Sequence, residues 1–303
     1  MKGHDEMINE MRKIEEKAFI WRQIRSSAMF VVVTLSTMLV IAPLVIMICY
    51  VIVNGLGAID ADFFTGELGS PARAMAGKET GLGHTMIGTF VVDTLALIIS
   101  APIGVAAGIL LSEYPAHRLN PLLRVMNDTL NGMPAIMKGL LAFALIVRPM
   151  GTFSGLSGSV ALAIVMIPIA ARSAESALSN VPWAIREAGL AIGLPRWRVI
   201  MSAVMPAAKN GLVTGFLLAF ARAAGEAAPL MFTSFGSNYL PDHWMGFILS
   251  PVDTLPQRLY ALAVSPYKEW HTMGWGAALV LMVFVAGLFI LARILTNKKL
   301  QNA

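Results

Sequence analysis

Charged side chains fall inside segments that are otherwise apolar, and five of them are the residues best suited to chemistry in this chain. They are Arg222, Glu226, Arg172, Lys138 and Asp93. A charge at the centre of a bilayer costs at least about 2.5–3.5 kcal/mol on insertion scales, so it rarely persists without a role. A guanidinium stays charged and offers a planar fork of donors, which suits an oxyanion. These residues therefore predict a path for a small hydrated anion.

Each of these charges also has a plainer interpretation. Arg222 and Glu226, one turn apart, could form an intrahelical pair that only stabilises the bundle. Arg172 lies near the predicted inner end of its span, where a long side chain can reach the cytoplasmic surface. Asp93 and Lys138 lie at similar predicted depths, so we expect an interhelical ion pair between them. The alternative is that Lys138 faces the path as an additional cation.

Motifs for catalysis and metal binding are missing from the sequence. The run nearest to a phosphate-binding loop, residues 132–139, lacks the second glycine and the Ser or Thr that would hold magnesium. The histidines are scattered, and Cys49 is the only cysteine, so neither a Cys-based metal site nor a disulfide within the chain is predicted. We therefore predict a transport subunit that is not itself an enzyme.

The composition predicts the elements that hold these charges. The chain has 303 residues, of which 56% are hydrophobic and only 14% charged, with a mean hydropathy of +0.68. A soluble domain carries about 25% charged residues. Six segments approach or exceed the roughly 20 apolar residues that cross a bilayer. They are residues 29–53, 85–111, 129–147, 158–178, 211–235 and 273–295. The prediction is an all-α polytopic membrane protein with six transmembrane helices.

Two of these segments contain local signals. Gly132-Met133-Pro134 predicts a break in the third span, and such breaks need protein or water cover, so they often border a transport path. A simple packing kink is the alternative. In the second span, Gly104 and Gly108 predict close contact with another helix.

The basic residues predict the orientation of the chain. Most Lys and Arg flank the loops on one side, which the positive-inside rule places in the cytoplasm together with both termini. We divide the chain into a cytoplasmic amphipathic segment (1–27), a permease domain (28–296) with a long cytoplasmic loop (179–210), and a cytoplasmic tail (297–303). The first segment lies on the inner membrane surface or packs on a cytoplasmic partner. The net charge of +5 reflects this topology, and we predict no nucleic-acid partner.

The long cytoplasmic loop is predicted to be a short helix, a sharp turn and a second short helix. Residues 181–192 have helical spacing of apolar side chains. The following Gly193-Leu194-Pro195 stops that helix, because glycine permits a left-handed turn and proline cannot continue the hydrogen-bond ladder. Such a shape suits docking into a groove on another protein.

The loop resembles the coupling loop of ATP-binding-cassette (ABC) importers, whose pattern is EAA-x3-G-x9-I-x-LP. The residues that occupy its main positions, and that we expect to contact an ATPase, are Glu187, Ala188, Gly189, Gly193 and Pro206. The chain departs from the pattern at Gly189, Ala203 and Met205, where Ala, Ile and Leu are expected.

Four further runs carry a closer resemblance. Residues 220–233, FARAAGEAAPLMFT, are similar to the pattern RxxGExAPLLFT of the phosphate-specific permeases of ABC importers, the PstA type. Residues 102–114, 167–175 and 265–270 match other stretches of that family. The resemblance runs from about residue 81 to the C-terminus.

The resemblance implies an ABC importer permease in the bacterial inner membrane that translocates inorganic phosphate. It implies a homologous second permease, an ATPase dimer that binds ATP-Mg, an external phosphate-binding protein and surrounding lipid as partners. This chain would bind no cofactor. Arg172 and Arg222 would serve phosphate passage, whereas Lys138 and Asp93 depart from the family. Alternatives are a permease for another oxyanion such as phosphonate or molybdate, an ion-coupled secondary transporter, and a structural membrane scaffold.

Overall fold

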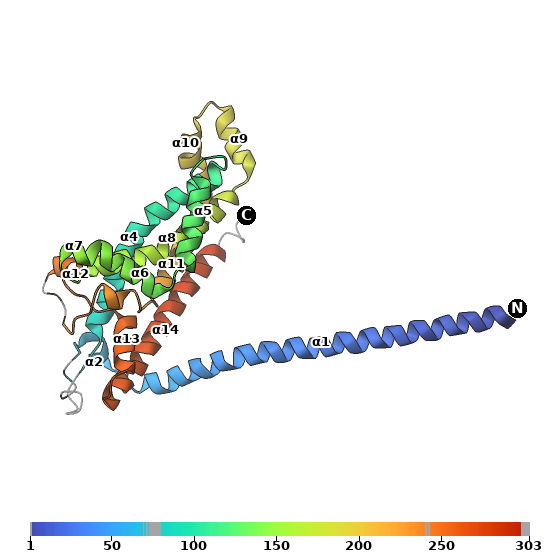
Figure 1. Ribbon diagram of the computed structural model, residues 1–303, viewed down its shortest axis with the longest axis horizontal. Coiled ribbons are helices and arrows are strands. Elements are labelled where there is room, and N and C mark those ends of the chain that lie inside the picture. Colours follow the sequence, from blue (N-terminus) through green and yellow to red (C-terminus); the bar gives the residue numbers. More distant parts are fainter. Residues whose placement is uncertain are drawn as a thin grey trace. The chain divides into compact units, whose positions relative to one another are not determined.

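The computed structural model describes residues 2–68, 70, 72, 80–239, 241 and 243–297, and side chains from residue 19 to residue 294 within these ranges. The described residues form helices and no β-strand, with one isolated bridge between Phe235 and Val252 (Figure 1). The all-α prediction is therefore confirmed. The chain divides into two compact units, Met1–Val53 and Asn54–Ala303.

The first unit is formed by most of one long helix, α1 (Lys2–Leu56), which contains Pro43. Its part Phe19–Leu56 is long and apolar enough to span a membrane, and none of its most apolar window is buried. Residues 2–27, predicted to be a separate amphipathic segment, are helical and continuous with this span. The side chains of residues 2–18 lie outside the described ones, so the amphipathic character of that segment stays a prediction.

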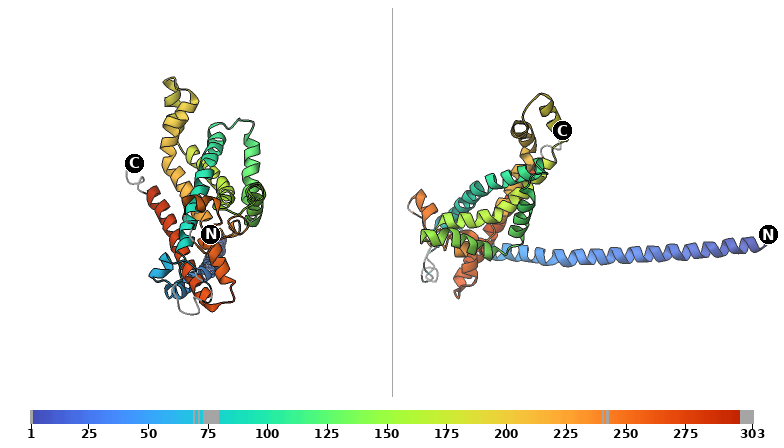
Figure 2. Two further views of the ribbon diagram at one scale, coloured as in Figure 1. Left: turned by 90° about the vertical axis from the view of Figure 1, so that its left-hand side faces the viewer. Right: turned by 45° about the horizontal axis from the view of Figure 1, so that its top comes forward.

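The second unit is built around α8 (Gly155–Ser179), the most deeply buried of its spans. A capping box between Ser154 and Ser157 begins this helix. Beside it lies α4 (Gly83–Glu113), as Figures 1 and 2 show. A Cβ atom on Gly104 or Gly108 of α4 would lie 2.5 Å from a Cβ atom of α8, which confirms the predicted close contact.

Further helices complete the bundle. On α8 packs α11 (Met205–Ala223), which in turn contacts α14 (Lys268–Asn297), and α14 also packs against α13 (Leu255–Ala263). The short elements α2 (Ala61–Thr65), η3 (Leu230–Phe232) and α12 (Trp244–Leu249) lie in the connections.

The third predicted span is broken, and it begins earlier than predicted. Helix α5 (Asn120–Gly132) ends where α6 (Ala135–Ala142) begins, and the two are bent by 111°. Beyond α6 the chain continues as η1 (Phe143–Val147) and α7 (Arg148–Met150). The break falls at the predicted place, because Pro134 has no amide hydrogen and pushes Met133 into an extended conformation. Among the described residues, five helices are long and apolar enough to cross a membrane, or up to six if the bent pair is one span.

Candidate functional site

Arg222 and Glu226 lie where α11 ends. The helix stops at Ala223, although we predicted a span reaching residue 235; a Gly225 turn and Pro229 follow and prevent it from continuing. Arg222 is therefore in the last turn, where the helix dipole favours a cation. Its Nη2 lies 3.5 Å from Oε1 of Glu226, and the two side chains are 62% and 21% exposed. The predicted pair exists, but Glu226 lies beyond the helix.

Lys138 belongs to the same cluster. It lies in α6, is 6% exposed, and interacts electrostatically with Glu226, which attracts it, and with Arg222, which repels it. The neighbouring Gly139 packs against the backbone of Pro229, where a Cβ atom would lie 2.7 Å from Cα. This contact holds α6 against the turn that carries Glu226. The three charged side chains, which we call the central cluster, carry a net charge of +1.

The ion pair predicted between Asp93 and Lys138 is wrong. Within the described part of the chain the ion pairs include neither residue, and Oδ2 of the buried Asp93 has no hydrogen-bond partner. The prediction counted depth along a straight third span. The 111° bend redirects α6, which packs on α8 and η3 and brings Lys138 to Glu226. The alternative interpretation, in which Lys138 faces the path as an additional cation, stays a prediction.

Arg172 lies in a second group of charges, between α5 and α8. It donates to Asp128, and Arg124 donates to Glu175 over 2.8 Å. These four residues, which we call the inner cluster, line a cavity of about 290 Å³ together with Leu111 and Asn127. The Arg172 and Arg124 side chains are 57% and 58% exposed. Each arginine faces one carboxylate, so the inner cluster is electrically neutral, and Arg172 does not join the central cluster.

The loop 179–210 has the predicted helix-turn-helix shape and projects from one end of the second unit (Figure 1). It consists of α9 (Trp183–Ala191), a turn with Gly193 at φ +83°, α10 (Arg196–Val199) and η2 (Ile200–Val204). The positive φ at Gly193 is a conformation that side chains with a Cβ atom rarely adopt. The glycine therefore sets the sharp turn between the two helices.

The loop exposes both its matched residues and apolar side chains. Glu187, Ala188, Gly193 and Pro206 are exposed, and Gly189 is half-buried against Val199. Large apolar side chains beside them are also exposed; these are Trp183, Leu190, Ile192 and Trp197. Ile192 is 77% exposed. Exposed apolar side chains on a projecting loop indicate a surface that another protein covers.

Sequence reasoning missed the role of Arg186 in this loop. The buried guanidinium donates to both carboxylate oxygens of Glu113, over 2.9 and 2.5 Å, and to the backbone oxygens of Val181 and Leu178. The hydrogen bonds to Glu113 raise the pKa of Arg186 above its usual value. Seventy-three positions separate the two residues. The only signal in the sequence was a carboxylate ending an apolar segment.

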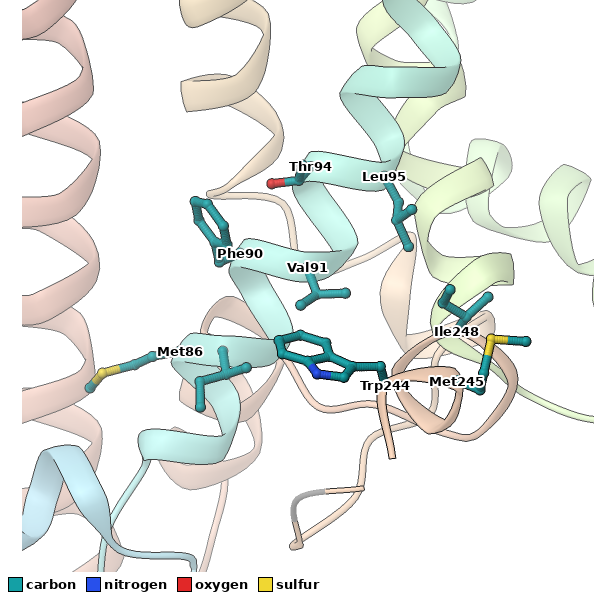
Figure 3. A pocket seen from close by; sticks show the side chains of 9 residues that line it. Met86, Phe90, Val91, Thr94, Leu95, Trp244, Met245 and Ile248 are labelled. Carbon is teal, nitrogen blue, oxygen red and sulfur yellow. The ribbon is translucent and has the colours of Figure 1, made fainter. Parts of the chain in front are cut away.

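A larger cavity lies between α4 and α12 and has a different character. It encloses about 570 Å³ and is lined by apolar side chains and one hydroxyl, with Phe90, Val91 and Trp244 among them (Figure 3). Since these side chains offer no cation and no N–H donor other than the Trp244 indole, the cavity does not suit a hydrated anion. The central cluster is the better candidate for the anion site.

Known proteins resemble this chain over most of its length. Residues 100–298 match the family described as "Binding-protein-dependent transport system inner membrane component". The chain is 38% identical over 252 residues to a phosphate transport system permease protein PstA of Xylella fastidiosa, covering 82% of this chain and 85% of that protein. It is 34% identical over 298 residues to a PstA of Yersinia pestis, covering 98% and 97%.

A solved structure shows the same fold. An inward-facing MetNI methionine ABC transporter has a chain that superposes with a TM-score of 0.54 at 20% identity, covering 70% of this chain and 92% of that chain.

Proposed function

Since this chain belongs to the PstA-type permeases, a family of inner membrane components of binding-protein-dependent transport systems, we propose that it carries inorganic phosphate across the membrane as a subunit of an ATP-driven importer. The observation that supports the proposal in the structure is the central cluster. Its two cations and one carboxylate lie at the end of α11, in the turn that follows it, and just beyond the break in the bent helix pair. A net charge of +1 favours the entry of one anion.

The three side chains have different tasks in this proposal. Phosphate sheds water to cross the membrane, and without a counter-charge that loss costs many kcal/mol. Arg222 is exposed enough to reach the anion with its paired donors, while the buried Lys138 adds a charge from the other side. Glu226 competes for Arg222 and keeps the site from holding phosphate too tightly, because transport requires release. Arg172 receives the anion at the inner cluster.

The energy source is proposed to lie on other chains. An ATPase dimer binds ATP-Mg and docks on the loop 179–210, through Glu187, Ala188, Gly189, Gly193 and Pro206. This places the loop, the N-terminal segment 1–27 and the tail 297–303 in the cytoplasm. A homologous permease completes the membrane part of the importer, and an external binding protein delivers phosphate.

Reconstitution tests the function directly. The complex, purified with its partner chains and placed in liposomes, should take up labelled phosphate only with ATP on the loop side and the binding protein on the other. Uptake should survive a proton or sodium ionophore. Preferred uptake of molybdate or phosphonate would favour another oxyanion, and collapse of uptake with the ionophore despite ATP would favour a secondary transporter.

Docking of the ATPase has its own test, made simple by the single cysteine. In a Cys49→Ser background, Ile192→Cys should cross-link to the ATPase chain, because this exposed side chain lies on the proposed docking surface. The matched control is Arg148→Cys. Arg148 is also exposed, but it lies near the end of the bent helix pair and outside the loop, so its cysteine should not cross-link. Equal cross-linking at both positions would contradict docking on the loop.

A further inference from the structure

Several helices meet at one buried residue. Glu113 is the last residue of α4 and is 2% exposed. Its two carboxylate oxygens accept from Arg186 of α9, and its backbone oxygen accepts from Arg196 of α10. Both arms of the helix-turn-helix loop are therefore bound to the same residue of α4.

Arg186 extends this connection to α8. Its Nη2 also donates to the backbone oxygen of Leu178, in the last turn of α8, over 2.9 Å, and its Nη1 donates to that of Val181 over 2.8 Å. Carbonyl oxygens at a helix C-terminus lack intrahelical partners and favour a cation. The guanidinium thus joins the ends of α4 and α8 through one rigid, planar group.

The aromatic contacts reinforce both arginines. The guanidinium carbon of Arg196 lies 4.7 Å from the ring centroid of Tyr114, the residue after Glu113, and that of Arg186 lies 5.4 Å from the Trp183 ring centroid. Contacts of this kind restrict where each guanidinium can lie. Neither arginine is a freely moving surface charge.

We propose that Glu113 is a positioning residue of the transport cycle: through Arg186 and Arg196 it makes the coupling loop and the ends of α4 and α8 move as one body. This inference rests on the proposed docking of the ATPase. A displacement of α9 by the ATPase then reaches α8, and with it Arg172 of the inner cluster. Contacts of Gly104 and Gly108 with α8 carry the same displacement along α4.

The test compares variants that remove the paired donors of the Arg186 guanidinium, with or without its charge. Arg186→Lys keeps the charge but cannot bind both carboxylate oxygens and both carbonyls, and Arg186→Gln removes the charge as well. Lys209→Gln removes a positive charge from the same loop, at an exposed residue outside these contacts, and is the matched control. If the buried variants fail to fold, Arg196→Gln replaces them, because that side chain is at the surface and loses the bond to the Glu113 carbonyl and the contact with the Tyr114 ring.

Three readouts on the reconstituted complex decide the question: ATP hydrolysed, phosphate taken up, and the cross-link to the ATPase formed by the Ile192→Cys substitution. For the Arg186 variants we expect the cross-link and basal ATP hydrolysis to persist, while phosphate taken up per ATP falls roughly 5- to 150-fold, the range of typical coupling energies. Lys209→Gln should keep the parent ratio. A purely structural role would lower all three readouts in proportion to the amount of complex.

Two results would overturn the proposal. An unchanged ratio of phosphate to ATP in the Arg186→Gln or Arg196→Gln complex would show that the contacts transmit nothing. Loss of both the cross-link and phosphate uptake would show that Glu113 only shapes the docking surface. Absence of the cross-link in the otherwise unaltered parent complex would refute the docking itself, separately from the role of Glu113.

Discussion

Arg222→Gln is the substitution that tests the anion site most directly. Glutamine keeps hydrogen-bonding capacity and most of the bulk but removes the charge. The central cluster then falls from a net charge of +1 to zero, because only Lys138 and Glu226 remain charged. Assembly should persist, since the Arg222 side chain is 62% exposed and its removal leaves no large cavity.

The magnitude follows from Coulomb's law at contact distance. Two unit charges about 4 Å apart interact by about 1 kcal/mol in water and about 4 kcal/mol at the effective dielectric constant near a protein surface. Because Arg222 is largely exposed, solvent screening keeps its interaction energy with phosphate in the lower half of this range. A change of about 1 to 2.5 kcal/mol lowers uptake by roughly 5- to 70-fold.

The assay is the initial rate of labelled phosphate uptake by the reconstituted complex, normalised to the amount of assembled permease. Arg222→Lys keeps the charge but loses the fork, so its rate should lie between those of the parent and Arg222→Gln. Arg148→Gln, an exposed arginine outside the cluster, should transport normally. Parent-like uptake by Arg222→Gln would refute the pathway argued above.

Three further substitutions test other parts of the structure. Lys138→Met should raise the phosphate concentration for half-maximal uptake, while the folded yield stays level or improves, because a buried charge without an ion pair is removed. Gly108→Leu should lower folded yield and cost about 1–3 kcal/mol, measured by thermal unfolding in detergent, because it overpacks the contact with α8, whereas Gly132→Ala, with open space at its Cβ, should cost little. Gly193→Val should strain the turn by about 1–3 kcal/mol and weaken recovery of the ATPase in pull-downs; full recovery with normal uptake would exclude the loop as the coupling element.

Patterns local in sequence predicted most of the fold. The lengths of the apolar segments predicted the spans. Gly193-Leu194-Pro195 predicted the turn in the loop 179–210, because backbone chemistry at these positions leaves few choices. The break at Pro134 was predictable for the same reason. Its direction was not, since the 111° bend depends on how α6 packs against α8 and Pro229.

Contacts between distant residues explain what the sequence could not show. Lys138 was assigned to Asp93 because both had similar depths along straight helices, and depth alone does not tell which face of a helix meets which neighbour. The bond between Glu113 and Arg186 joins residues seventy-three positions apart, and no periodicity connects them. Gly225 and Pro229 are signals for the early end of α11. The apolar residues around them favoured a longer span, so the end was not predicted.

Because α1 is long, the thickness of the lipid bilayer should affect how this helix lies in the membrane. Its apolar run, residues 29–53, extends about 38 Å as a helix, which is longer than the ~30 Å of a bilayer's hydrocarbon core. A helix of that length meets the membrane with a mismatch that tilting, local thickening or emergence into the headgroups must absorb. Membranes of different acyl-chain length should therefore set the helix at different angles, and reconstitutions in short-chain and long-chain lipids are not equivalent experiments.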